Sequence, residues 1–128
     1  MITKNQLIEK LRDKDYRDAY VAEAVDTTPA IQVRIMRKER DWSQSELAAA
    51  AEMAQARVSQ IENPDYGRLT LATLKRLASA FDVALMVRFV PFSELIKWTT
   101  EFDDHVFYLP TFDEELAPKP GIIPLTLR

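Results

Sequence analysis

The chain has 128 residues, of which 47% are hydrophobic and 29% charged, a composition typical of a globular domain with a core of its own. It contains no cysteine and one histidine, which excludes disulfides and thiolate zinc sites and leaves little for a metal site or a Ser-His-Asp triad. No apolar run approaches the roughly 20 residues of a membrane span, and the N-terminus is too charged for a signal peptide. We therefore expect a cytoplasmic protein that is not an enzyme and uses no cofactor.

The net charge of −3 is unevenly distributed along the chain. Residues 1–27 and 77–128 are acidic, whereas residues 28–76 carry 8 basic and 6 acidic side chains. Attraction to nucleic acid depends on the local patch rather than on the total charge. The middle of the chain therefore permits contact with a polyanion, although a surplus of two charges does not indicate one by itself.

Apolar periodicity predicts helices in the first third of the chain, over residues 5–12 and 15–25. Thr28 followed by Pro29 has the pattern of an N-cap and a first helical residue. We therefore expect the second helix to end before this pair and a new helix to run from it to about Arg40.

Three more helices are predicted between residues 43 and 81. Ser43 with Glu46 three residues later forms a capping box, which marks the start of the first. A second short helix is predicted over residues 55–62. Thr70 begins the third, in which apolar residues recur at spacings of three and four up to Phe81.

The hydrophobic period changes after residue 82. The segment VALMVRFV, residues 83–90, is β-branched and aromatic and is followed by proline, which predicts a strand. A short helix is expected up to about residue 102, and HVFYL at 105–109 predicts a second strand. Prolines and an acidic run predict an extended or partly disordered tail over residues 110–128.

The two short helices that begin near Ser43 and Gln55 are joined by a tight turn, and their inner positions are small or apolar. This is the pattern of a helix-turn-helix, in which the second helix enters the major groove. Arginine can make two hydrogen bonds to guanine, and glutamine can do the same to adenine. Both residue types occur at the outward positions of the second helix, which are Gln55, Ala56, Arg57, Ser59 and Gln60.

The stretch WSQSELAAAAEMAQARVSQIENP, followed by LTLATLKRLASAFDV, resembles the lambda-repressor-like, or Xre-type, helix-turn-helix family over roughly residues 30–83. The resemblance implies a five-helix domain that binds double-stranded DNA, usually as a dimer. It implies base contacts by Gln55, Ala56, Arg57 and Gln60. It also implies phosphate contacts by Ser43, Gln44, Asn63 and Arg68, and a buried ion pair of Arg37 with Glu62.

Two residues depart from the family pattern at the turn. Glu52 stands where members often have glycine, and a non-glycine residue at positive φ costs about 1 kcal/mol. Ala54 stands where members often have a capping serine or threonine, and the missing cap costs about as much. Both departures affect the stability of the turn and leave the outward face of the second helix intact.

Several nearby side chains are given structural roles rather than functional ones. We expect Arg34, Lys38 and Arg40 to form a solvated helix face, and Trp42 to belong to the core. The acidic residues of the C-terminal third are expected to be solvated rather than to form a catalytic or magnesium site.

The predicted strand at 83–90 is hydrophobic on both faces, so its edge needs a partner, either HVFYL or the same strand of a second subunit. A reader of two half-sites also requires two copies. We therefore expect a homodimer whose interface includes Val83, Leu85, Val87 and Phe89.

Together these features predict a mostly α-helical protein with four parts: an N-terminal helical extension (1–27), a helix-turn-helix DNA-binding domain (28–82), a strand-helix-strand dimerisation element (83–109) and the tail (110–128). The predicted function is a sequence-specific transcriptional regulator, a repressor that binds a palindromic operator as a homodimer. The alternative is an antitoxin, in which residues 1–27 or 101–128 wrap and silence a toxin.

Overall fold

The structure is a computed structural model in which residues 2–117, 120–123 and 125 are described. Over these residues the chain is mostly helical and contains no β-strand. The prediction of a mostly α-helical protein is therefore confirmed. The elements are α1 (Lys4–Lys10), α2 (Lys14–Glu39), α3 (Gln44–Ala50), α4 (Gln55–Ile61), α5 (Leu71–Phe81), α6 (Phe92–Thr100), a 3-10 helix (Asp104–Phe107) and α7 (Phe112–Leu116).

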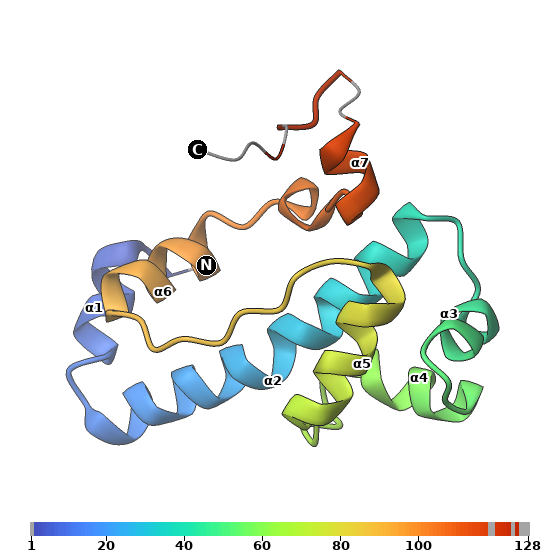
Figure 1. The fold of residues 1–128 in the computed structure, drawn as a ribbon. Coiled ribbons are helices and arrows are strands. Elements are labelled where there is room, and N and C mark those ends of the chain that lie inside the picture. Colours follow the sequence, from blue (N-terminus) through green and yellow to red (C-terminus); the bar gives the residue numbers. More distant parts are fainter. Residues whose placement is uncertain (1, 118–119, 124, 126–128) are drawn as a thin grey trace.

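The 26-residue helix α2 crosses the molecule and carries packed helices at both of its ends (Figure 1). α3, α4 and α5 lie toward its C-terminal end, and α1 and α6 lie at its N-terminal end. Residues 82–91 run beside α2 from the end of α5 back to the start of α6. Within the described residues, no helix is long and apolar enough to cross a membrane.

The larger core lies where the C-terminal half of α2 meets α3, α4 and α5. Leu47 and Val58 are 0% exposed and Ile61 is 1% exposed, and full burial of such a side chain contributes about 1.5–3 kcal/mol. The small side chains of Ala48 and Ala51 are also buried, which lets α3 and α4 cross closely. The other members of this core are Val33, Met36, Leu77, Phe81 and Phe107.

A second, smaller core joins α1 to α6. Leu7 and Leu11, at α1, pack against Ile96 of α6, and Tyr16 and Tyr20 of α2 cover them. Residues from the predicted N-terminal extension and from the region after residue 90 therefore form one packed unit on the N-terminal half of α2.

The predicted break at Thr28 and Pro29 is wrong, because α2 continues through both residues. Pro29 has no amide proton, so the carbonyl of Val25 lacks its helical partner. Val25 is 63% exposed, and water therefore reaches this turn, whereas Ala30 is 1% exposed and keeps the next turn in the core. The predicted boundary between residues 27 and 28 consequently falls inside one helix. Residues 28–82 contain the C-terminal part of α2 and all of α3, α4 and α5, which makes four helices rather than the five that the resemblance implies.

The two predicted strands are also wrong. Residues 83–90 have no regular structure, and within the described residues no backbone hydrogen bond joins residues 84–90 to another segment. The predicted partner at 105–109 lies largely in a 3-10 helix, which begins where the carboxylate of Asp103 accepts a hydrogen bond from the amide of His105 at 2.9 Å. β-propensity measures how well a side chain fits a sheet, and it cannot supply the neighbouring strand.

The predicted extended tail contains a helical turn, α7. The hydroxyl of Thr111 accepts a hydrogen bond from the amide of Glu114 at 3.2 Å, and the amide of Thr111 donates to the Glu114 carboxylate at 3.1 Å. This capping box explains why the helix forms there. The predicted tail also includes residues 118–119, 124 and 126–128, which lie outside the described residues.

Three helices end on acidic residues in the left-handed conformation: Asp41, Glu52 and Asp82, with φ of 57°, 56° and 55°. After α3, the amide of Met53 donates to the carbonyl of Ala48 at 2.9 Å, and the amide of Glu52 donates to Ala49 at 3.3 Å. This pair of bonds is the Schellman motif, which favours glycine at the left-handed position. The turn between α3 and α4 therefore stores the strain expected from Glu52.

We expect Glu52→Gly to raise the free energy of unfolding by about 0.5–1 kcal/mol, because glycine relieves the left-handed strain but gains freedom in the unfolded chain. Urea denaturation followed by circular dichroism measures the change.

The matched control is Ala49→Gly, which introduces the same residue at an exposed position inside α3. There it should lower the free energy of unfolding by about 1 kcal/mol. A loss of stability in both variants would contradict strain at Glu52.

Candidate nucleic-acid interface

The first residues of α3 and α4 are stabilised differently. The hydroxyl of Ser43 accepts a hydrogen bond from the amide of Glu46 at 3.0 Å, and the Glu46 carboxylate accepts one from the amide of Ser43 at 3.1 Å. This reciprocal capping box begins α3 as the spacing predicts. α4 begins at Ala54 with no side-chain cap, so its position depends on packing and on the contacts described next.

A buried ion pair joins α2 to the end of α4. Arg37 Nε lies 2.6 Å from Glu62 Oε2 and Arg37 Nη2 lies 2.9 Å from Glu62 Oε1, while Nη1 donates to the carbonyl of Trp42 at 2.8 Å. The two side chains are 11% and 5% exposed. The hydrogen bonds to Glu62 raise the pKa of Arg37 above its ordinary value and outweigh the opposing effect of burial, so the guanidinium stays charged.

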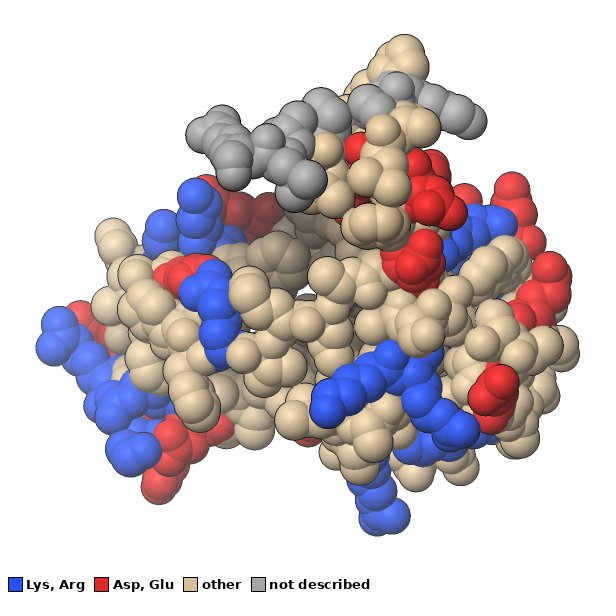
Figure 2. All heavy atoms as spheres, in the orientation of Figure 1, with Lys and Arg blue, Asp and Glu red and all other residues tan. Residues whose placement is uncertain are grey.

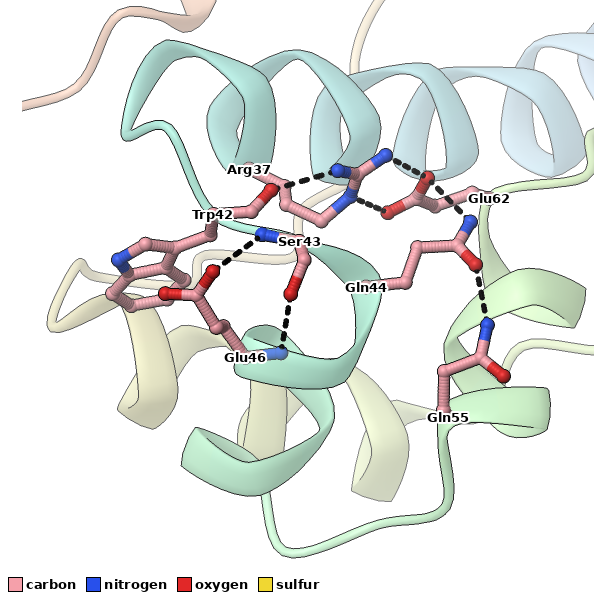
Figure 3. A network of polar contacts seen from close by, with 7 residues as sticks. All are labelled: Arg37, Trp42, Ser43, Gln44, Glu46, Gln55 and Glu62. Atoms are coloured by element: carbon pink, nitrogen blue, oxygen red, sulfur yellow. Dashed lines mark hydrogen bonds and ion pairs between the residues drawn. The ribbon is translucent and has the colours of Figure 1, made fainter.

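Two glutamines extend this network to the surface (Figure 3). Gln44 Nε2 donates to Glu62 Oε1 at 3.3 Å, and Gln44 Oε1 accepts from Gln55 Nε2 at 2.7 Å. Because the carboxylate of Glu62 can only accept, the amide nitrogen of Gln44 must face it, and the amide oxygen must face Gln55. The buried charge therefore sets the orientation of Gln55, the first residue of α4.

The outward face of α4 carries the side chains expected to contact bases. Gln55, Ala56 and Gln60 are exposed and Arg57 is half-buried, whereas Val58 on the opposite face is fully buried. Arg57 Nη1 lies 3.4 Å from Gln60 Oε1. Arginine and glutamine side chains thus stand next to each other on one exposed strip of the helix.

A tyrosine that the sequence analysis did not single out lies beside this strip. The guanidinium of Arg57 is 5.4 Å from the centre of the Tyr66 ring, and that of Arg68 is 6.0 Å from it. An aromatic face attracts a guanidinium and limits its rotation. Tyr66 therefore brings a predicted base-contacting residue and a predicted phosphate-contacting residue to the same place. A tyrosine within a loop pattern gives no sequence signal for this role.

The remaining predicted phosphate contacts surround the same face. Asn63 Oδ1 accepts a hydrogen bond from the amide of Asp65 at 3.0 Å, which shapes the loop after α4. This bond uses the oxygen, so the amide nitrogen of Asn63 is the group suited to a phosphate. The hydroxyl of Ser43 can likewise donate while its oxygen caps α3.

Figure 2 shows one group of basic side chains over α5, a second group at the end of the molecule that holds α1, and acidic side chains around α7. α5 contributes Lys75 and Arg76, and Arg76 Nη2 lies 3.4 Å from the carbonyl of Glu52 in the turn. The positive charge of the middle of the chain is therefore placed next to the helix-turn-helix pair, where a polyanion would approach.

Arg40 does not belong to a solvated face, which corrects the prediction for this residue. Its guanidinium lies 5.6 Å from the Trp42 ring and 5.1 Å from the Phe81 ring, and Nη1 donates to the carbonyl of Phe81 at 2.5 Å. The two rings are stacked, with centres 5.6 Å apart. Arg40 therefore ties α2 to α5, and Trp42 packs against the core as the sequence suggests.

The residues predicted at a subunit interface lie in the extended segment 83–90. Val83 is half-buried, whereas Leu85, Val87 and Phe89 are 41%, 66% and 105% exposed. Residues 84–90 thus expose apolar side chains, and their backbone groups make no backbone hydrogen bond to another segment among the described residues.

The fold and this face define a helix-turn-helix unit: two short helices crossing at a tight turn, with an exposed polar strip on the second. Residues 33–86 match the family model described as Helix-turn-helix, of the Xre and lambda-repressor-like type. This region therefore belongs to that family, and the resemblance seen in the sequence is confirmed. The family consists of DNA-binding regulatory domains, so residues 33–86 have the features of a domain found in DNA-binding transcription regulators. No curated protein and no solved structure matches the chain.

The buried pair should show strong energetic coupling. Arg37→Met and Glu62→Leu should each lower the free energy of unfolding by about 3–5 kcal/mol, because each leaves one buried charge unpaired. The double variant should lose less than the sum of the two by about 2 kcal/mol or more. Urea denaturation of the four proteins gives the coupling energy.

The exposed pair Arg12 and Glu9, with side chains 73% and 69% exposed, serves as the control. Arg12→Met and Glu9→Leu should be additive within about 0.5–1 kcal/mol. Equal coupling energies for the two pairs would show that burial of Arg37 and Glu62 has no special effect.

Proposed function

We propose that this protein is a sequence-specific DNA-binding regulator that represses transcription by binding a palindromic operator as a homodimer. The observation that carries the proposal is the outward face of α4 with Gln55, Arg57 and Gln60, in which a network that reaches into the core orients Gln55 and the Tyr66 ring lies beside Arg57. A surface held in one orientation loses less conformational entropy when it binds.

In this proposal α4 enters the major groove and α3 crosses the backbone. Arg57 and Gln60 discriminate bases, and each good pair of contacts is worth about 1–3 kcal/mol. Ala56 has no hydrogen-bonding group and is suited to the methyl group of thymine. Ser43, Gln44, Asn63 and Arg68 contact phosphates and fix the register.

The extended segment 83–90 supports the homodimer. The backbone groups of residues 84–90 make no backbone hydrogen bond to another segment among the described residues, and the predicted partner within the chain lies largely in a 3-10 helix. Of the two partners that the sequence allows, the same segment of a second copy is the one left. Antiparallel pairing about a two-fold axis would satisfy both backbones and cover both sets of apolar side chains.

An antitoxin role stays a second candidate. Exposed apolar side chains occur among acidic ones near the C-terminus, including Phe112 at 52% and Leu116 at 56% exposure. Such a surface suits a basic protein partner with an apolar patch. Co-purification with a small basic protein encoded by a neighbouring gene would support this role, and it is compatible with operator binding.

The test of DNA reading begins with selection of binding sites from a random DNA pool, from which we expect a palindrome. Arg57→Ala should then weaken binding to the selected operator by about tenfold or more, because a base contact is lost. Binding to random DNA should fall much less. Fluorescence anisotropy at one fixed salt concentration measures both affinities.

Arg68→Ala is the matched control, since it removes a guanidinium beside the same Tyr66 ring. As a phosphate contact, its loss should weaken operator and random DNA by similar factors. Equal losses on both DNAs for Arg57→Ala would contradict base reading by this residue. Failure to enrich any sequence would contradict the proposed function.

We expect Val87→Asp to convert the dimer to a monomer at micromolar concentration. Because of the two-fold axis, both subunits place the substituted residue in the interface. Two carboxylates would then lose their water close to each other. Since Val87 is 66% exposed in the single chain, the monomer should stay folded. Sedimentation velocity measures the mass, and circular dichroism checks the fold.

Ile8→Asp, on α1 and 41% exposed, is the control and should leave the dimer intact. Persistence of the dimer in Val87→Asp would exclude segment 83–90 from the interface.

A further inference from the structure

A cavity of about 250 Å³ lies between α2 and aromatic residues in and after α6. Tyr20 and Glu23 line it from α2, and Trp98, Phe102 and Phe107 line it from the other side. Pockets for drug-sized ligands usually measure about 300–1,000 Å³. This cavity therefore suits a smaller molecule. It is separate from the face of α4 described above.

Three aromatic rings form one wall of the cavity. The ring centres of Phe102 and Phe107 are 5.1 Å apart, those of Trp98 and Phe107 are 5.6 Å apart, and those of Trp98 and Phe102 are 6.3 Å apart. Phe107 is 2% exposed, but Trp98 and Phe102 keep 39% and 40% of their surface exposed. The protein's own packing therefore leaves part of these two rings available for contact.

The residues that line the cavity include an acidic side chain and no basic one. Glu23 supplies a carboxylate, and no lysine, arginine or histidine is among the lining residues. The hydroxyl of Thr99 donates to the carbonyl of Ile96 at 3.2 Å and accepts from the hydroxyl of Tyr20. The Tyr20 hydroxyl therefore already has a hydrogen-bond partner, and this bond joins α2 to α6. Glu23 is the remaining strong acceptor for a ligand.

We propose that this cavity binds a small organic monocation with an apolar body, of the arylalkylammonium class. Aromatic faces attract a cation within about 6 Å of the ring centre, and the carboxylate of Glu23 adds an opposite charge at the same site. The apolar body is accommodated by the rings and by Ile31, which also packs against the larger core. A neutral molecule of the same shape gains the apolar contact alone.

Isothermal titration calorimetry on the full chain tests the proposal with three probes of similar shape: phenethylammonium, neutral 2-phenylethanol and anionic phenylacetate. The cation should bind with a dissociation constant at least about tenfold below that of the alcohol, and phenylacetate should bind more weakly than the alcohol. Bound phenethylammonium should also raise the melting temperature of the protein.

Glu23→Gln should weaken binding of phenethylammonium about tenfold and leave 2-phenylethanol unchanged. The matched control is Glu101→Gln, which removes the same charge at an exposed position outside this cavity and should change neither affinity. Trp98→Leu should weaken both probes.

Three results would overturn the proposal. The first is equal affinity for cation and alcohol, which would mean an apolar cavity without charge selection. The second is an equal effect of Glu23→Gln and Glu101→Gln, which would mean a general effect of net charge. The third is no binding of any probe at about 10 mM. None of these measurements involves DNA, so their failure is separate from a failure of operator binding.

Discussion

The buried ion pair between Arg37 and Glu62 is the contact on which the placement of α4 and the orientation of its first residue, Gln55, depend. It joins the C-terminal part of α2 to the residue that ends α4, and its third hydrogen bond holds the corner at Trp42. The side chains of Arg37 and Glu62 are 11% and 5% exposed. Each charge needs the other as a partner, because a single buried charge would lose its water without a compensating interaction. The same carboxylate orients Gln44, and Gln44 orients Gln55. A contact in the core thus decides the orientation of the Gln55 amide at the start of α4.

The long helix α2 gives the molecule its second constraint. One core forms on its C-terminal half with α3, α4 and α5, and a smaller one forms on its N-terminal half with α1 and α6. Because α2 is one continuous helix, it fixes the position of one core relative to the other. The chain returns between them as an extended segment with exposed apolar side chains. The segment runs along α2, away from α3 and α4.

Local signals in the sequence were reliable where the deciding contacts are themselves local. Ser43 and Glu46 form the capping box that their spacing predicts, and Thr70 caps α5. Glu52 adopts the left-handed conformation that the turn requires. The Thr28-Pro29 pattern failed because the burial of Ala30 outweighs the loss of one hydrogen bond at Pro29. The spacing of Thr111 and Glu114 is also that of a capping box, but the prolines and acidic residues around it favoured the prediction of an extended tail.

The sequence by itself determined the class of the protein, because the apolar spacing, the caps and the Gln and Arg positions of a helix-turn-helix lie within one continuous stretch. Tertiary structure alone decided three other features. It placed the Tyr66 ring beside Arg57 and Arg68 and turned Arg40 onto the stacked rings of Trp42 and Phe81. It also left the backbone groups of residues 84–90 without a backbone hydrogen bond to another segment among the described residues. The physical reason is the same in each case. Each feature depends on how separate helices and loops pack against one another, and no local sequence pattern encodes that packing.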